Sequence, residues 1–139
     1  MEIRYQFIEK DNLLIQKYIG DFSVEHYVSF MKMIVTNKQW KTIDKVLTDL
    51  VDTDLQIAYK RLDSLIKFRI DKISRGYYNV FLVTNPQATA ITHLYQKRLK
   101  DKKFAYDYCS TIKHAIELLK LDSTLLEMEN TISILENRF

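Results

Sequence analysis

The stretch VLTDL at residues 46–50, together with VFLVT at residues 80–84, decides the fold of this chain. Both are short apolar runs rich in β-branched residues, and such runs predict buried strands. Each is followed by a segment with helical periodicity, and no glycine-rich phosphate loop lies between strand and helix. This alternation predicts an α/β protein in which helices connect the strands of one sheet.

The segments before residue 80 extend this pattern. Residues 3–8 and 13–19 are strand-like runs separated by a polar turn, so they predict an antiparallel hairpin. Ser23 is expected to cap a helix that ends near Asn37. A second helix is expected to begin at residues 52–54, directly after the third strand, and to end near residue 73.

The remaining elements complete the prediction. Asn85 precedes a proline at the start of a helix, residues 104–109 form a fifth strand, Ser110 caps another helix, and Asp122 begins the last one. We therefore predict a mixed sheet of about five strands that opens with an antiparallel hairpin and continues in parallel. Helices should pack mainly on one face. Residues 1–120 would form the α/β domain, and residues 121–139 an additional amphipathic C-terminal helix.

Composition sets limits on function. The chain has 139 residues, a hydrophobic share of 47%, and a formal charge of +3, which is too small to indicate a nucleic-acid partner. No stretch approaches the roughly 20 apolar residues of a transmembrane helix. The single cysteine, Cys109, excludes an internal disulfide, and the N-terminus lacks the pattern of a signal peptide. We expect a soluble cytoplasmic protein.

Several of these segments resemble the SpoIIAA-like branch of the STAS domain superfamily, over residues 3–120. The resemblance is carried by YIG at residues 18–20, the two strands quoted above, NPQATA at residues 85–90, and YCST at residues 108–111 with Ala115 behind it. It implies a mixed sheet with helices largely on one face. It also implies a regulatory, partner-binding or lipid-associated role in place of catalysis.

Phosphorylated members of this superfamily carry a Ser or Thr at the start of the helix after the third strand. Here Thr53 is the only hydroxyl residue in that segment, and it lies between Asp52 and Asp54, which would repel a phosphate. The resemblance therefore does not extend to a phosphorylation switch.

Polar residues at the ends of the third and fourth strands form one candidate ligand site. Ligands of open α/β sheets usually bind at the carboxyl ends of the strands. Oxygen ligands there could hold Mg²⁺, but the other residues of a phosphoacceptor site are missing, and helix capping is the favoured explanation. We therefore expect no metal and no cofactor. The candidate residues are Asp49, Asp52, Thr53, Asp54, Thr84 and Asn85.

No group of residues indicates catalysis. The three histidines lie in different predicted helices, and Cys109 lies in an apolar strand without a basic neighbour to lower its pKa. We predict that the protein is not an enzyme and has no catalytic residue.

Aromatic residues of the hairpin and first helix form a second candidate site, an apolar groove for a lipid or small molecule. Ordinary core packing is the competing explanation. A basic run at residues 97–103 is interpreted as a solvated turn, and if it binds anything, an anionic lipid headgroup fits the resemblance better than RNA. The groove residues are Tyr5, Phe7, Tyr18, Phe22 and Tyr27.

The last segment carries a heptad-like apolar seam that must be buried somewhere. Packing on its own domain and packing on a second subunit are both open. The leading prediction is a non-catalytic module that binds a protein partner, such as a second copy, through the sheet edge and this segment. The alternative is a lipid or small-molecule carrier. The seam consists of Leu121, Leu125, Met128, Ile132, Leu135 and Phe139.

Overall fold

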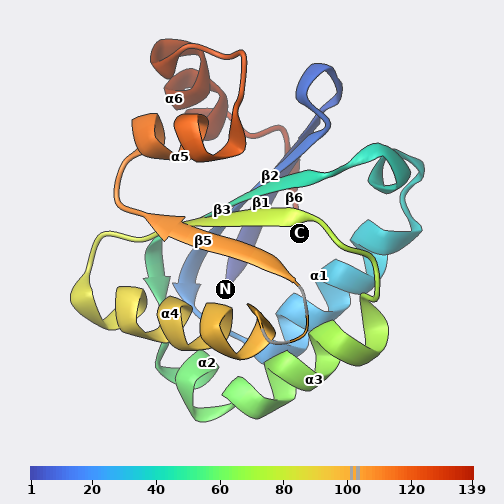
Figure 1. Ribbon diagram of the computed structural model, residues 1–139, viewed down its shortest axis with the longest axis vertical. Helices are drawn as coiled ribbons and strands as arrows, with labels where there is room; N and C mark the ends of the chain where they lie inside the picture. Colours follow the sequence, from blue (N-terminus) through green and yellow to red (C-terminus); the bar gives the residue numbers. More distant parts are fainter. Residues whose placement is uncertain (101, 103) are drawn as a thin grey trace.

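The computed structural model describes residues 1–100, 102 and 104–139, and Lys103 of the basic run lies outside these residues. Strands and helices alternate through most of the chain (Figure 1). The strands are β1 (Glu2–Ile8), β2 (Leu13–Asp21), β3 (Lys45–Asp54), β4 (Tyr78–Leu82), β5 (Ala105–Cys109) and β6 (Asn137–Arg138). The helices are α1 (Val24–Thr36), α2 (Gln56–Lys60), α3 (Leu62–Lys72), α4 (Pro86–Lys100), α5 (Ile112–Leu119) and α6 (Leu125–Ser133).

The strands form one mixed sheet in the order β5-β4-β3-β2-β1-β6. β1 and β2 pair antiparallel as a hairpin, and β2, β3, β4 and β5 are mutually parallel. The predicted α/β class, the opening hairpin and the parallel continuation are therefore confirmed. β6 is an additional strand, antiparallel to β1 at the outer edge.

Helices cover both faces of this sheet, four on one face and two on the other (Figure 1). Side chains alternate along each strand, so Leu14 packs toward α1–α4, whereas Leu13 and Ile15 pack toward α5 and α6. Because both faces are covered, consecutive residues of the central strands are buried, instead of every second one.

Side-chain caps fix where most helices begin. Ser23 accepts a hydrogen bond from the backbone nitrogen of His26, as the sequence predicts for α1. α5 is capped by Thr111 and not by the predicted Ser110. α6 begins after Thr124, later than the predicted Asp122, because Thr124 and Glu127 form a reciprocal capping box.

The predicted helix start at residues 52–54 is wrong. β3 continues to Asp54, since its last residues pair with the end of β2 after a register shift near Lys17. Thr53 therefore lies in a strand. The helix that follows is also divided, because it is interrupted at Arg61 between α2 and α3.

The predicted C-terminal helix is shorter than expected. α6 ends at Ser133, and the chain then turns back to form β6. The backbone nitrogen and oxygen of Phe139 both bond to Ile3, which holds this segment against β1. No helix in the described residues combines the length and hydrophobicity that crossing a membrane requires.

Candidate functional site

Four of the six residues predicted at the strand ends surround an open hollow of about 370 Å³. Asp52, Thr53, Asp54 and Asn85 line it, together with Asp21. Asp49 and Thr84 do not line it. Asp49 lies in the middle of β3, where it is buried, and its position alternates onto the sheet face that α5 and α6 cover.

Most of these polar groups already have a structural role. Asp52 lies 2.7 Å from the ammonium group of Lys17, and Asp49 lies 3.4 Å from the same group. Burial alone would lower the pKa of Lys17, but the hydrogen bond to Asp52 and the charge of Asp49 outweigh burial and raise it. Asp54 and Asn85 accept hydrogen bonds from the backbone at the starts of α2 and α4.

The Thr53 hydroxyl is equally occupied, because it donates to the carbonyl oxygen of Tyr18 at 2.7 Å. In the described part of the chain, no three His, Cys, Asp or Glu side chains gather as a metal ion would require. The described polar residues around the hollow therefore cap helices, bond to the backbone or form the ion pair with Lys17. Their main role is to stabilise the ends of strands and helices.

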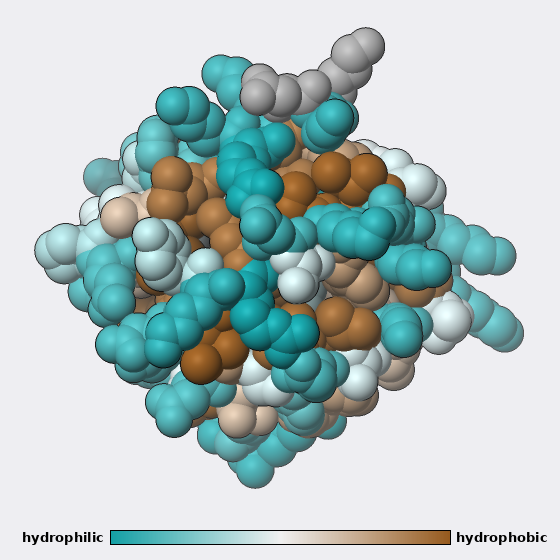
Figure 2. All heavy atoms as spheres, turned by 90° about the horizontal axis from the view of Figure 1, so that it is seen from below, coloured by the Kyte–Doolittle hydropathy of each residue, from teal (hydrophilic) through white to brown (hydrophobic). Residues whose placement is uncertain are grey.

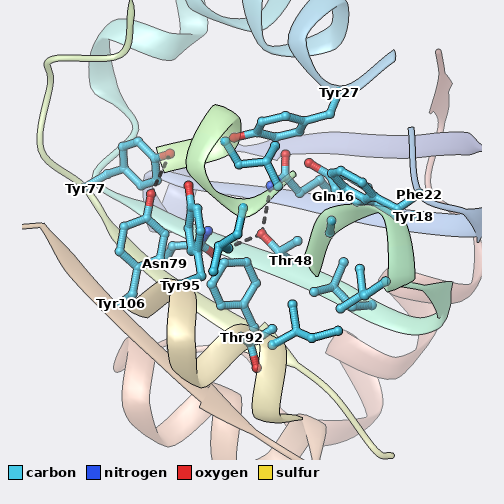
Figure 3. Close-up of a pocket in the computed structure, with 17 residues that line it drawn as sticks. Gln16, Tyr18, Phe22, Tyr27, Thr48, Tyr77, Asn79, Thr92, Tyr95 and Tyr106 are labelled. Atoms are coloured by element: carbon cyan, nitrogen blue, oxygen red, sulfur yellow. Dashed lines mark hydrogen bonds between the residues drawn. The ribbon is translucent and has the colours of Figure 1, made fainter. Parts of the chain in front are cut away.

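A second space, the central cavity, lies between β2–β5 and the helices α1–α4, and its volume is about 70 Å³ (Figure 3). Three predicted groove residues line it, namely Tyr18, Phe22 and Tyr27. Tyr5 and Phe7 do not. The ring of Tyr5 packs against Phe30, at a centroid distance of 5.3 Å.

A row of polar side chains crosses the floor of this cavity, and the sequence-based prediction missed it. Gln16, Thr48 and Asn79 lie on three adjacent strands, and all three are buried. The Gln16 amide donates to the Thr48 hydroxyl at 2.7 Å, and that hydroxyl donates to the Asn79 carbonyl oxygen at 2.9 Å (Figure 3). Leucine or valine would be expected at such positions.

Two buried polar atoms at this end of the cavity have no hydrogen-bond partner among the described residues. They are the amide oxygen of Gln16 and the hydroxyl of Tyr18. Buried polar groups in native proteins are nearly always paired, so each exception needs an explanation, and a functional role is one of those explanations. The Gln16 amide oxygen and the Tyr18 hydroxyl are therefore free to form a hydrogen bond with a ligand.

The opposite end of the cavity is a cluster of tyrosines backed by a buried arginine. Tyr77 from the segment before β4, Tyr95 from α4 and Tyr106 from β5 converge there (Figure 3). Behind them lies Arg69 of α3, which is 0% exposed and donates from Nε to the Tyr106 hydroxyl at 2.7 Å. We call Tyr77, Tyr95, Tyr106 and Arg69 the tyrosine–arginine cluster.

Burial raises the pKa of Tyr18, Tyr77 and Tyr95 well above the ordinary tyrosine range. Burial also raises the pKa of Tyr106, and the Arg69 guanidinium partly offsets that effect. These hydroxyls therefore keep their protons at neutral pH, and each can donate a hydrogen bond.

The raised tyrosine pKa values predict a loss of stability in alkali. Unfolded tyrosines lose their protons near pH 10, while the buried ones hold them, so the free energy of unfolding should be level from about pH 7 to 9 and fall above about pH 10. Urea titrations at several pH values across this range measure the free energy of unfolding. In Tyr77→Phe the slope should be less steep by about 1.4 kcal/mol per pH unit. Tyr59→Phe, at a side chain that is 58% exposed, should leave the slope unchanged.

The seam residues divide into two groups. Met128, Ile132 and Leu135 are buried on the sheet of the same chain, within the cluster that covers the α5 and α6 face. Leu125 and Phe139 keep substantial exposure, and Leu121 is intermediate. Leu126 and Ile134, which the seam prediction did not include, are the most exposed hydrophobic residues of this segment, at 66% and 71%.

Comparison with known proteins adds no assignment, since no family model and no curated protein matches the chain. The resemblance to SpoIIAA-like proteins therefore stays a prediction. Function has to follow from the geometry of the central cavity.

Proposed function

We propose that this protein is a non-catalytic binding protein that holds a small, largely apolar molecule in the central cavity. The main support is the pair of unpartnered buried atoms, the Gln16 amide oxygen and the Tyr18 hydroxyl. Leaving a buried polar atom unpaired costs about 1–3 kcal/mol, so a core built for stability alone would carry an apolar side chain at position 16. A ligand that donates a hydrogen bond to Gln16 removes that cost.

The cavity volume indicates how such a molecule fits. About 70 Å³ is roughly half of the ~150 Å³ in which an engineered apolar cavity of another protein holds benzene. The polar end of a ligand fits this space, and a longer apolar part needs room beneath the wall formed by Leu55, Ala58 and Leu62.

The helix α2 is the part of that wall best suited to move. It has only five residues, a single side-chain hydrogen bond, which Asp54 accepts, holds its start, and Arg61 separates it from α3. Its outward residues Ile57 and Tyr59 are exposed. Seen from below, the helix-covered side of the molecule has hydrophobic residues exposed between hydrophilic ones (Figure 2). Few buried contacts make local opening cheap, and we place ligand entry at α2.

Native mass spectrometry of the protein purified from expressing cells tests this function. The wild type is expected to carry a bound organic molecule. Ala58→Met places a larger side chain in the cavity wall and should reduce the bound fraction at least about tenfold. Tyr59→Met, at the exposed neighbouring position, should leave it unchanged. Equal occupancy in Ala58→Met, or a wild type without any bound molecule, would contradict the proposal.

Gln16→Met separates binding from stability. It removes the unpaired oxygen together with one hydrogen bond to Thr48, so the free energy of unfolding should stay within about 1 kcal/mol of the wild type. The bound molecule should be lost. Urea denaturation and native mass spectrometry of the same sample measure both. A destabilisation above about 2 kcal/mol would identify Gln16 as a structural residue instead.

Self-association is a second candidate function, supported by the exposure of Leu126 and Ile134 beside the buried part of the seam. The partner in this case is a second copy of the chain, which would cover these side chains. Light scattering on the wild type and on the double variant Leu126→Ser/Ile134→Ser tests it. A dimer that the substitutions dissociate supports self-association, and a monomeric wild type removes it.

A further inference from the structure

The tyrosine–arginine cluster carries information about the chemical class of the ligand. Arg69 is among the largest fully buried side chains of the described residues. Its guanidinium donates to the Tyr106 hydroxyl and to the carbonyl oxygens of Ile73 and Arg75. Its planar group also lies 3.9 Å from the ring centre of Phe104 and 4.5 Å from that of Tyr77. The side chain is therefore held rigidly in one place.

All of these hydrogen-bond acceptors are neutral. Carbonyl and hydroxyl oxygens and aromatic rings stabilise a cation through their dipoles and quadrupoles, but they do not cancel its charge. Burial alone would lower the pKa of Arg69, yet the surrounding tyrosines raise it, so the guanidinium stays charged. Its positive potential extends through the low-dielectric interior toward the cavity that Tyr77 and Tyr106 line.

The direction of the hydrogen bonds determines what this end of the cavity offers. Because the Tyr106 oxygen accepts from Arg69 Nε, the Tyr106 proton is available to another acceptor. The Tyr77 hydroxyl is one such acceptor, and it lies at the long distance of 3.4 Å. A cation that donates to a hydroxyl makes that hydroxyl a stronger donor in turn. The tyrosine end is therefore rich in donors, whereas the Gln16 end presents an acceptor.

From this arrangement, and resting on the proposed function, we infer that the ligand is a largely apolar monoanion that ends in a carboxylate and carries a hydrogen-bond donor, such as a hydroxyl, toward Gln16. The carboxylate accepts hydrogen bonds from the hydroxyls of Tyr106 and Tyr77, and Arg69 supplies the compensating charge one hydrogen bond behind them. The apolar remainder of the molecule lies between Phe81, Ile91 and the underside of α2.

The charge of Arg69 favours a monoanion over a neutral acceptor of the same shape. Hydrogen bonds to an ionised acceptor are roughly twice as strong as neutral ones, and more so inside a protein than in water. One buried cation also matches one negative charge. A doubly charged phosphate monoester would bring a second charge into an apolar space with nothing in the cluster to offset it.

Three probes of equal chain length test the inference: hexanoate, hexanamide and 1-hexanol. NMR titration of the full-length protein at neutral pH gives the dissociation constant of each. Hexanoate should bind at least about tenfold more tightly than either neutral probe, because it alone brings charge-assisted hydrogen bonds to Tyr106.

Matched variants identify the group that recognises the carboxylate. Tyr106→Phe should weaken hexanoate binding about tenfold or more and change 1-hexanol binding much less. Tyr108→Phe, on the same strand with its hydroxyl toward His93, should leave both unchanged. Circular dichroism and urea unfolding of each variant verify that it is folded.

The possible failures have different meanings. Equal or tighter binding of 1-hexanol or hexanamide would overturn the carboxylate inference and leave the proposed binding function standing. If Tyr106→Phe weakens the binding of all three probes equally, the inference is overturned as well. Tyr106 would then shape the cavity but would not recognise the negative charge of the ligand. If none of the probes binds, the inference fails, and the proposed function is decided by the molecule found on the wild type and its loss in Ala58→Met.

Discussion

Removing residues 121–139 is expected to abolish cooperative folding. Met128, Ile132 and Leu135 are buried on the sheet face that carries Leu13 and Ile15. Burying a side chain of this size contributes about 1.5–3 kcal/mol, so the three together contribute roughly 5–9 kcal/mol. This is comparable to the total stability of an ordinary domain, about 5–15 kcal/mol. The truncated chain also loses β6 and its bonds to Ile3.

Circular dichroism and urea unfolding of residues 1–120 measure this effect. Leu126→Ser in the full chain is the control, because that side chain is 66% exposed and its replacement should change stability by less than about 0.5 kcal/mol. A truncated protein that remains a folded monomer would contradict the packing described here. A truncated protein that folds only as a dimer would show that a second subunit can replace α6.

Arg69→Ala is expected to destabilise the protein by about 3–5 kcal/mol. The substitution leaves a void between Phe104 and Tyr77, where the guanidinium was stacked. It also removes the donor that the hydroxyl of Tyr106 and two backbone carbonyls share. Buried acceptors left without a donor each cost about 1–3 kcal/mol.

Urea denaturation of two further variants places this loss in context. Arg61→Ala is the matched control, since Arg61 lies on the surface and its ion pair is with an exposed Glu25, so the change should cost less than about 1 kcal/mol. Arg69→Lys keeps the charge but loses the planar group that stacks and donates in several directions. Its stability should fall between those of the wild type and Arg69→Ala. A loss below about 1 kcal/mol in Arg69→Ala would show that the buried bonds contribute little.

Much of the fold was predictable because local patterns and global pairing agree. Residues 46–50 and 80–83 are buried without a break because β3 and β4 are covered on both faces, and such short, mostly apolar segments predict parallel strands. Ser23 and Asn85 cap their helices as expected, because a cap depends on only a few neighbouring residues.

The errors fall where distant pairing overrides a local signal. Residues 52–54 are rich in helix-capping side chains, yet the end of β2 pairs with them and extends the strand. The spacing of Met128, Ile132 and Leu135 continues to Phe139 as it would in a helix, but Phe139 pairs with Ile3 instead. No local pattern encodes a contact between residues so far apart.

The candidate site was predicted only in part. Aromatic residues of β2 and α1 indicated an apolar space, and Tyr18, Phe22 and Tyr27 do line the cavity. A signal for Gln16 and Thr48 was present, because each is a polar residue between inward-facing apolar neighbours on its strand. Their alignment into one row depends on the strand register, which the sequence alone does not reveal.

Arg69 was missed for a related reason. It occupies a position on the apolar stripe of α3, close to Leu65 and Ile66, where a charged residue is ordinarily taken as solvated. Its partner Tyr77 comes from the segment before β4, and its partner Tyr106 comes from β5. A charged residue at a stripe position is therefore a useful indication of a buried polar site.

The order in which the sheet is covered has a consequence for the protein during its synthesis. A ribosome delivers the hairpin first, whereas α6 and β6, which cover one face and the outer edge of that hairpin, emerge last. Until then Leu13, Ile15 and Leu47 face water, in a nascent chain that already contains most of its strands. Such exposed surface is what chaperones bind, and slowing translation between α5 and α6 should prolong their association with the nascent chain.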